Sequence, residues 1–377
     1  MFTLLSCPPQ RTLDSSLPYK IAMVVPGLGF DGDSLETKAL GGSETAAIYM
    51  ARGLARLGHK VTVFATTNRP GIYHGVNYLP FERWDQAITH VPHDISILQR
   101  MLDAFAVPRA GKLNILWCHD LLTAEFAARL SAALPNTHGV FVVSDYMAEH
   151  YRAMARFRDG QLFVTANGLD GALISSVAPA GPRDPFHLFY SARPERGLDI
   201  LLADVMPRVL AKEPRVRLSL ATYENTGDEL KPFYDICDRL AAKSGRARFL
   251  GHLSKSALYA QMKTAGIYAY PTPSPIMPDF AEVSCISVME ARACGQSVVT
   301  CPRGALPETV PDATFVEGEP GTPSFAEAFA AALIDKMHAP PAPTLMTRDW
   351  NDIAKAWDIQ FARMMQQRDS RLGVAVP

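Results

Sequence analysis

Residues 278–295 read PDFAEVSCISVMEARACG and describe a loop that turns into a helix. Apolar and small residues at 288–293 favour a helix, and Gly295 stands where that helix should stop. Ser287 and Glu290 have the spacing of a capping box, in which each side chain satisfies a backbone N–H of the other. We therefore predict that the helix begins near Ser287.

The start of this helix is predicted to bind an anion. The N–H groups after Ser284, at Cys285 and Ile286, have no partner within the helix, and the helix dipole adds partial positive charge. Two carboxylates, Glu282 on the loop and Glu290 in the first turn, flank the site. A nucleotide sugar has phosphates in the middle and hydroxyl groups at both ends, so we expect that ligand here. In the alternative interpretation Glu290 only caps the helix and Glu282 is solvated.

The same stretch resembles a family signature. Glu282 and Glu290 are separated by seven residues, and the run EARACGQSVVT that starts at Glu290 is similar to an E-A-x-A-C-G-x-P-V-V segment. That segment belongs to the large retaining glycosyltransferase family with the GT-B fold and the E-x(7)-E motif, of the group 1 and family 4 type. Ser297 departs from the pattern, where proline is usual. The resemblance implies two facing Rossmann-like, doubly wound α/β domains. It also implies transfer of a hexose from a nucleoside-diphosphate sugar to a hydroxyl group, with retention at the anomeric carbon.

Length and composition are those of a globular protein of several domains. The chain has 377 residues, enough for two or three domains, of which 48% are hydrophobic and 20% charged. A formal net charge of −1 gives no general attraction to nucleic acid. No apolar run approaches the roughly 18 residues that span a bilayer, and the lipoprotein-like start that ends at Cys7 lacks a basic leader. The six cysteines form no C-x-x-C pair, so we expect reduced thiols and a cytoplasmic protein.

The first half of the chain alternates predicted strands with helical segments. The predicted strands occupy residues 20–25, 60–65, 94–99, 113–117, 139–143 and 162–166. This alternation indicates a parallel, doubly wound sheet, on which ligands bind beyond the carboxyl ends of the strands. His119 follows one of these strands and should face that crevice, in a segment that resembles the family's H-x-H-D. The alternative is a structural histidine.

Two glycine-rich segments follow the first strand. Residues 27–32 match G-x-G-x-x-G, but no helix opens at these glycines and no acid ends the next strand, which argues against a nicotinamide cofactor. In residues 41–45, GGSET, the glycines let a backbone approach a ligand, Ser43 is predicted as the N-cap, and Gly58 ends the helix. We predict a second phosphate-binding helix start at Gly42 and Ser43, in a segment that resembles the family's G-G-x-E opening. The alternative is a turn without a ligand.

A second series of strands follows a linker rich in proline and small residues at 175–185. The strands are predicted at residues 187–192, 216–222, 248–250, 266–271, 297–300 and 313–316, which indicates a second α/β domain. In the terms of the resembled family, the predicted parts are an N-terminal arm (1–18), an acceptor-side domain (19–184), a nucleotide-sugar donor domain (185–345) and a C-terminal crossover helix (346–377).

The last predicted helix carries an apolar stripe that must be buried. It consists of Trp350, Ile353, Trp357, Phe361 and Met364. The resemblance implies that this helix crosses back onto the first domain, and a dimer interface is the alternative.

Arg193 and Arg196 follow the first strand of the second domain. Guanidinium groups match the geometry of phosphate, so the two arginines are predicted to clamp a diphosphate. Arg196 aligns with the lysine of a P-E-K-G-L segment in the resembled family, whereas the family's arginine in G-R-L falls on Ser191. Arg193 either assists or is solvated. The alternative for Arg196 is a surface ion pair with Glu195 or Asp199.

The resemblance implies a role for each candidate residue and no cofactor or metal ion. The diphosphate is held by arginines and helix N–H groups, the sugar and ribose by carboxylates, and the base mainly by backbone. The residues implied as catalytic are Glu282, His119 and Arg196, and those implied to bind the donor are Gly42, Ser43, Arg193, Arg196, Leu253, Glu282, Ser284, Cys285, Ile286 and Glu290.

The acceptor is the partner that the sequence specifies least. The resemblance implies a glycan or a lipid-linked hydroxyl. Arg152, Arg156 and Arg158 either form a basic rim for an anionic lipid at the inner face of a membrane or lie on a solvated helix face, and the second interpretation is favoured. Two alternatives to a transferase stay open. One is another enzyme on this fold, a nucleotide-sugar epimerase or a phosphorylase, and the other is a non-catalytic nucleotide-sugar-binding protein.

Overall fold

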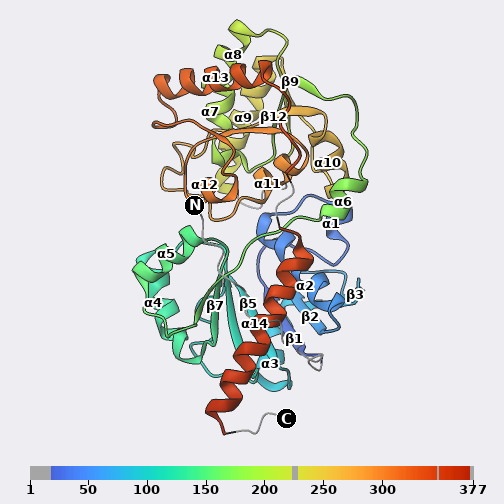
Figure 1. The fold of residues 1–377 in the computed structure, drawn as a ribbon, viewed down its shortest axis with the longest axis vertical. Coiled ribbons are helices and arrows are strands. Elements are labelled where there is room, and N and C mark those ends of the chain that lie inside the picture. The colour runs from blue at the N-terminus through green and yellow to red at the C-terminus, as the bar shows by residue number, and fades with distance from the viewer. Residues whose placement is uncertain (1–17, 223–227, 346–347, 374–377) are drawn as a thin grey trace, which may run out of the picture.

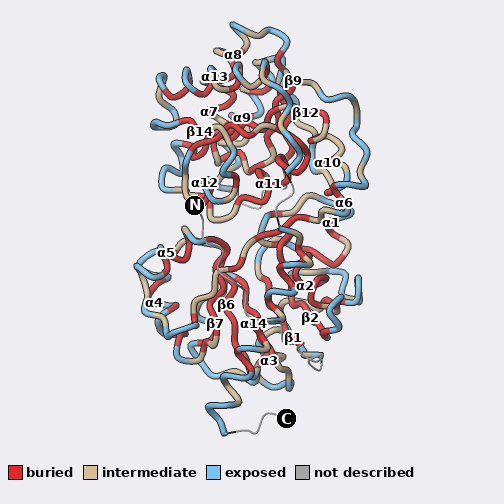
Figure 2. Tube along the Cα trace, viewed as in Figure 1, coloured by how far each residue is buried: buried red, intermediate tan, exposed pale blue. Residues whose placement is uncertain are grey.

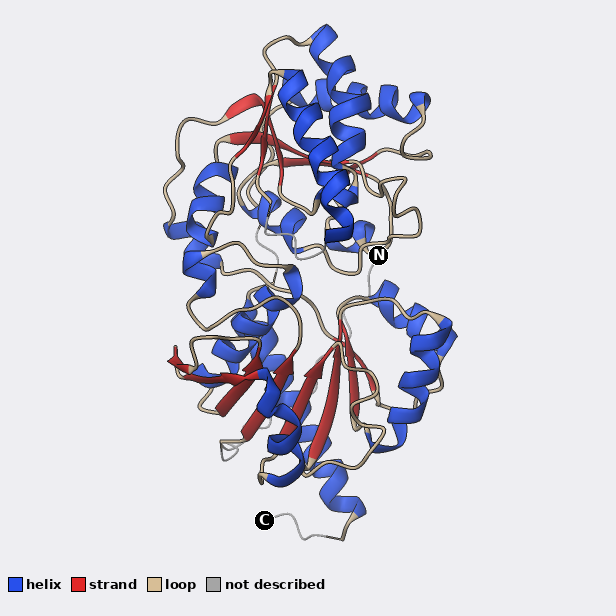
Figure 3. Cartoon of the chain, turned by 180° about the vertical axis from the view of Figure 1, so that it is seen from behind, coloured by secondary structure: helices blue, strands red, loops and turns tan. Residues whose placement is uncertain are grey.

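Two separate sheets divide the protein into two α/β domains, which lie one above the other in Figure 1. The computed structural model describes residues 18–222, 228–345 and 348–373. Helices flank both sheets (Figure 3), and the buried segments run mainly along the strands (Figure 2). Strands covered on both faces must be apolar along their whole length, as the short hydrophobic runs of this sequence are. The alternation of strands and helices therefore predicted the fold class correctly.

The first sheet has the strand order β3-β4-β2-β1-β5-β6-β7-β8. Every neighbouring pair is parallel except β3 and β4, which form a hairpin that the sequence analysis did not predict. Its turn lies at His74 and Gly75, both with positive φ, as a two-residue hairpin turn requires. The strands are β1 (Lys20–Val25), β2 (Lys60–Ala65), β3 (Gly71–Tyr73), β4 (Val76–Pro80), β5 (Ile95–Gln99), β6 (Leu113–Cys118), β7 (Gly139–Val142) and β8 (Leu162–Val164).

Three helices of this domain begin with side chains that cap them. Thr123, Ser144 and Asp170 each accept a hydrogen bond from the backbone N–H three residues later. The helices are α1 (Ser34–Thr37), α2 (Gly42–Arg56), η1 (Phe81–Arg83), α3 (Trp84–His90), α4 (Ala124–Ala133), η2 (Leu134–Asn136), α5 (Asp145–Met154) and α6 (Gly171–Ser176).

The second sheet is parallel throughout, with the order β11-β10-β9-β12-β13-β14. Its strands are β9 (Asp184–Tyr190), β10 (Arg217–Leu220), β11 (Ala247–Phe249), β12 (Ala265–Tyr270), β13 (Ser297–Thr300) and β14 (Thr314–Phe315). Its helices are η3 (Pro194–Arg196), α7 (Leu198–Ile200), η4 (Leu201–Val205), α8 (Met206–Lys212), η5 (Asp228–Leu230), α9 (Lys231–Ser244), α10 (Lys255–Met262), α11 (Ile286–Ala293), α12 (Leu306–Thr309) and α13 (Pro323–His338). The chain reaches this domain between α6 and β9.

Helix α14 (Trp350–Arg371) returns to the first domain and packs along α2 (Figure 1). Trp350 stacks on Tyr49, with ring centroids 5.9 Å apart. Trp357 is fully buried, and its indole N–H donates to Thr165 Oγ1 at 2.7 Å. The predicted crossover is thus confirmed, and its apolar stripe is buried within the chain.

The described cysteines are all buried and free. Cys7 and the rest of residues 1–17 lie outside the described residues. Among the helices that the structure describes, none is both long enough and apolar enough to cross a bilayer.

Candidate active site

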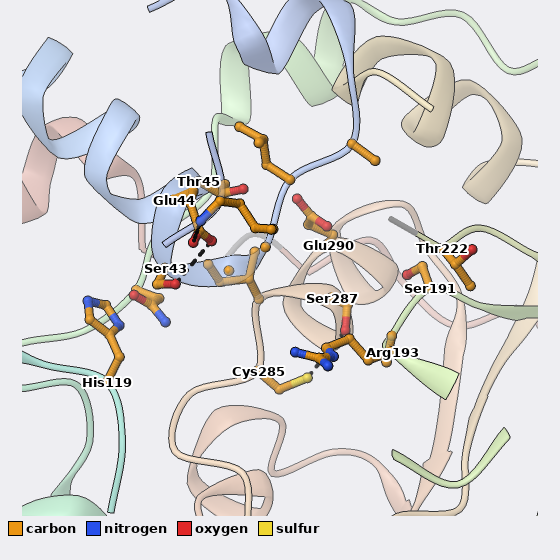
Figure 4. Close-up of a pocket in the computed structure, with 18 of the residues that line it drawn as sticks. Ser43, Glu44, Thr45, His119, Ser191, Arg193, Thr222, Cys285, Ser287 and Glu290 are labelled. Carbon is orange, nitrogen blue, oxygen red and sulfur yellow. Dashed lines mark hydrogen bonds between the residues drawn. The ribbon is translucent and has the colours of Figure 1, made fainter. Parts of the chain in front are cut away.

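A cavity of about 590 Å³ lies between the two domains and is lined by both. Figure 4 shows Ser43, Glu44 and His119 on one side of it and Ser287, Glu290 and Arg193 on the other. The cavity brings together every residue predicted for the site, namely Gly42, Ser43, His119, Arg193, Arg196, Leu253, Glu282, Ser284, Cys285, Ile286 and Glu290. Their individual roles stay predictions.

Helix α11 starts at the cavity but is capped differently from the prediction. It begins at Ile286 with Cys285 as the N-cap, so Ser287 lies inside the first turn. The predicted capping box is wrong, because the Glu290 carboxylate is directed to other donors. The predicted end is confirmed: Gly295 has a φ of 80°, and its N–H donates to the carbonyl of Arg292, as in a glycine-terminated helix.

Helix α2 also starts at the cavity, at Gly42, with Gly41 as the N-cap. The prediction of Ser43 as the N-cap is wrong, because its hydroxyl donates to Glu44 Oε2 at 3.1 Å instead. A methyl group added to Gly42 would lie 3.8 Å from Ile286 Cδ1. The N-termini of α2 and α11 therefore lie close together at the cavity wall, and both ends carry partial positive charge. This arrangement suits a ligand with negative charge in its middle.

Glu282 is buried and held by two donors on the same oxygen. Arg196 Nη1 lies 3.3 Å from Glu282 Oε1, and the Tyr270 hydroxyl donates to Oε1 at 2.5 Å. Burial, and then the charge of Glu282, raise the pKa of Tyr270, so the phenol stays a donor. Gly304, with a φ of 61°, packs against the Glu282 backbone so closely that any side chain there would collide with it. The carboxylate is thus preorganised at the cavity wall.

The two predicted arginines have different partners. Arg196 pairs with Glu282 rather than with Glu195 or Asp199, and its guanidinium lies 4.7 Å from the Phe280 ring centroid. Arg193 forms an ion pair with the buried carboxylate of Glu195. The alternative of a surface pair for Arg196 is therefore wrong. A guanidinium has five N–H donors, so each arginine can serve a carboxylate and a phosphate together.

His119 is a neutral side chain in this site. Gln99 Nε2 donates to Ser43 O at 2.9 Å and to His119 Nε2 at 2.8 Å. His119 Nε2 therefore accepts a hydrogen bond, and the ring proton lies on Nδ1. Burial, and then the positive charge of Arg100, lower the pKa of His119 to about 3. The imidazole can donate from Nδ1 at neutral pH but carries no charge.

Polar contacts join the two domains at the cavity wall and at the start of α5. Asn167 Nδ2 donates to Ser284 O at 3.0 Å, which fixes the loop before α11 from the opposite domain. The Glu308 carboxylate accepts from the N–H groups of Asp145 and Tyr146, each at 3.2 Å. These are the first N–H groups of α5, so an acid of the second domain occupies a helix N-terminus of the first.

Several side chains of the site were missed from the sequence. Lys255 Nζ lies 2.5 Å from Glu290 Oε1, and the Tyr259 hydroxyl donates to the same oxygen at 2.8 Å. Lys255 and Tyr259 are one turn apart on α10, which places them on one face. Nothing local in the sequence links that face to Glu290, so only the fold could identify these partners.

The proposed basic rim of Arg152, Arg156 and Arg158 does not form one cluster of free guanidinium groups, because Arg158 is directed to the backbone. Arg152 lies on the exposed side of α5, as expected for a solvated face. The Arg158 guanidinium donates to the carbonyl oxygens of Leu134 and Thr137. Its charge is therefore directed to the backbone of its own domain.

Two carboxylates and a histidine form a cluster apart from the cavity. Asp33, Glu36 and His74 lie close enough to share a cation. None of them lines the cavity, and Glu36 pairs with Arg52 at 2.8 Å. Asp31 and Asp33 have the D-x-D spacing of some metal sites, but Asp31 pairs with Arg69.

Comparisons with known proteins match both halves of the chain. Residues 40–172 match the family described as Glycosyltransferase Family 4, and residues 186–338 match the family described as Glycosyl transferases group 1. A similar protein of Arabidopsis thaliana is named as one of the subunits of phosphatidylinositol N-acetylglucosaminyltransferase. It is 22% identical over 378 residues, which cover 86% of this chain and 79% of that protein.

Solved structures show the same architecture at low sequence identity. AviGT4, a glycosyltransferase involved in avilamycin A biosynthesis, is 18% identical with a TM-score of 0.63, over 93% of this chain and 98% of its own. HepE of Anabaena in complex with UDP-glucose is 16% identical with a TM-score of 0.62, and the match covers 95% of this chain and 100% of HepE. The fold is therefore GT-B, as predicted. The two family matches, one on each domain, support a glycosyltransferase with this fold.

Proposed function

We propose that this glycosyltransferase moves a hexose from a nucleoside-diphosphate sugar to a hydroxyl acceptor with retention of the anomeric configuration. The observation that carries the proposal is the Arg196–Glu282 ion pair beside the N-terminus of α11, with Glu290 in the same cavity. Cationic and N–H donors stand where a diphosphate would lie, and a carboxylate flanks them on each side. The UDP-glucose in the HepE structure is a ligand of this class.

The proposed mechanism assigns the diphosphate to positive groups of the protein. Charge grows on the leaving diphosphate as the sugar bond breaks, and preorganised donors stabilise it most effectively. Arg196, Arg193 and the N–H groups from Ser284 to Ile286 are those donors. They need no divalent metal ion, so we propose metal-independent donor binding.

The proposed roles of the other side chains follow from their positions. Glu282, held by Arg196 and Tyr270, accepts hydrogen bonds from sugar hydroxyls and orients the ring. Glu290 accepts hydrogen bonds from the ribose. His119 Nδ1 donates to the transferred sugar or to the acceptor from the first domain.

We place the acceptor on the first-domain side. A second cavity, of about 480 Å³, adjoins the first and shares Arg100, His119 and Asp120 with it. Leu102 and Phe126 give this second cavity apolar walls. A glycan or lipid-linked hydroxyl is the proposed acceptor, and a cytoplasmic protein at the inner face of a membrane is the proposed setting. The name of the Arabidopsis relative, which includes phosphatidylinositol, agrees with a lipid-linked substrate.

The test begins with calorimetric titration of UDP, GDP and ADP in buffer that contains a chelator. We expect one of them to bind, and the matching α-linked sugar nucleotides are then incubated with candidate acceptors. NMR of the product should show an α-linkage. Absence of binding by all three nucleotides contradicts the proposed donor, and a strict metal requirement contradicts the metal-independent mechanism. Conversion of the donor to another sugar nucleotide without an acceptor identifies an epimerase, and an intact donor with every acceptor indicates a binding protein.

A further inference from the structure

Glu290 is held on one oxygen by two donors from a single helix. Lys255 Nζ and the Tyr259 hydroxyl both lie on α10 and both contact Glu290 Oε1, at 2.5 and 2.8 Å. Ser254 caps this helix by accepting from the Ala257 N–H, which fixes the first turn on which Lys255 stands. Since both donors converge on Oε1, the other carboxylate oxygen, Oε2, is left for a ligand.

The two donors differ in their access to the cavity. Lys255 and Glu290 both line it, whereas Tyr259 lies behind them and is 1% exposed. Burial and the charge of Glu290 raise the pKa of Tyr259, so it stays a neutral donor. Lys255 has three N–H bonds, of which Glu290 Oε1 takes one. A ligand in the cavity therefore meets an ammonium and a carboxylate side by side.

An ion pair at a cavity wall suits two neighbouring hydroxyl groups. A carboxylate only accepts hydrogen bonds and an ammonium only donates them, whereas a hydroxyl does both. A vicinal diol can thus donate from one hydroxyl to the carboxylate and accept at the other from the ammonium. Stability alone is a weak reason for the pair, because buried ion pairs are often no better than apolar residues of similar size.

We propose that Lys255 is a donor-specificity residue, which together with Glu290 recognises the 2′,3′-diol of the donor ribose. The inference rests on the proposed nucleoside-diphosphate donor and adds the residue that distinguishes ribose from deoxyribose. Glu290 Oε2 accepts from one hydroxyl, and Lys255 Nζ donates to the oxygen of the other. Tyr259 lies behind the cavity wall as a second donor to the Glu290 carboxylate and takes no part in recognition of the diol.

The experiment compares ribonucleotides with their deoxy forms. The nucleoside diphosphate that binds tightest among UDP, GDP and ADP is titrated by calorimetry beside its 2′-deoxy and 3′-deoxy analogues. In the wild type, removal of either hydroxyl should weaken binding about tenfold to a hundredfold, as expected for loss of a hydrogen bond to a charged group. In Lys255→Met, the penalty for one of the two hydroxyls should fall to within about threefold, because its partner is gone.

Two control variants separate specificity from structure. Tyr259→Phe removes the other donor to Glu290 Oε1 without changing the cavity wall, so both penalties should persist. Lys243→Met removes an exposed lysine of α9 and should leave binding unchanged. If Lys255→Met does not fold, as judged by circular dichroism, Lys255→Leu, which also lacks a side-chain N–H donor, is measured in its place.

Each outcome decides the inference. If the Lys255 variant keeps the wild-type loss of affinity for both deoxy analogues, the lysine is only a structural partner of Glu290. If the wild type binds the deoxy analogues as tightly as the ribonucleotide, diol recognition is excluded. Both results leave the proposed donor intact. No binding of any nucleoside diphosphate overturns the proposed donor, and this inference with it.

Discussion

Arg196 Nη1 lies 3.3 Å from Glu282 Oε1, so the cation assigned to the diphosphate and the carboxylate assigned to the sugar form one ion pair. Residues in direct contact do not contribute independently to binding or catalysis. Loss of the arginine removes a phosphate donor and also leaves Glu282 buried beside a single phenol. The two assigned functions must therefore be tested together.

A double-mutant cycle on this pair is the first prediction. Arg196→Ala should lower donor affinity or turnover by between about 30-fold and several thousand-fold, because loss of one partner of a buried charged pair costs about 2–5 kcal/mol. Glu282→Ala should lower kcat more than donor affinity, because it orients the sugar whose bond breaks. The double variant should lose less than the two single losses combined, by about 0.5–3 kcal/mol. Steady-state kinetics and calorimetry measure each term.

Two results would contradict this account of the pair. Wild-type turnover in Glu282→Ala would mean that residues 278–295 only hold the nucleotide. Strict additivity of the two losses would mean that the pair is not coupled in the active protein.

His119→Ala tests the contact from the first domain. The neutral imidazole donates a single hydrogen bond from Nδ1 in the proposed complex, so kcat should fall about tenfold while the donor dissociation constant changes by less than about threefold. His90→Ala, at the exposed end of α3, is the matched control and should behave as the wild type. If turnover and affinity are both unchanged in His119→Ala, the histidine is structural.

Trp357→Ala tests the crossover helix. The indole is fully buried between the rings of Trp117 and Phe141, and truncation of such a side chain costs about 3–5 kcal/mol in the free energy of unfolding. Urea denaturation measures the loss. Trp84→Ala, at a partly exposed site on α3, should lower the free energy of unfolding by less than Trp357→Ala does. An unfolding midpoint equal to that of the wild type would show that the packing of Trp357 against the first domain does not stabilise the protein.

Glu308→Ala tests the closure of the cleft. The carboxylate at the N-terminus of α5 contributes up to about 2 kcal/mol to the contact between the domains, so its loss should favour more open arrangements. Small-angle scattering should show a larger radius of gyration for the free variant. Glu319→Ala, an exposed acid of the same domain, should leave the scattering unchanged. An identical curve for Glu308→Ala would mean that this contact does not hold the domains together.

His187 makes the stability depend on pH. Burial, and then the charge of Arg217, lower its pKa from about 6.5 to about 4, so the native protein resists protonation that the unfolded chain accepts. The stability from this group is fully present above about pH 6.5 and is lost as the pH falls toward 4, at roughly 1.4 kcal/mol per unit. Between pH 7 and pH 5, His187→Gln should therefore lose about 2 kcal/mol less unfolding free energy than the wild type. Equal losses in urea titrations would contradict this origin.

Local patterns in the sequence determined the class of the fold and the place of the site. Short apolar runs predicted the strands of both sheets within a few residues, because strands covered on both faces must be apolar. Gly58 and Gly295 ended their helices as expected, since the left-handed backbone there favours glycine. The β3–β4 hairpin was missed because its short strands carry no comparable apolar run.

The tertiary structure alone decided which partners the site residues have. Glu290 has the spacing of a capping box with Ser287, yet its carboxylate binds Lys255 and Tyr259, which lie 35 and 31 positions away. A buried carboxylate needs a cation or several strong donors, and this need outweighs the smaller gain from capping one N–H group. Which donors are near is set by how α10 and α11 pack, and no local pattern encodes that packing.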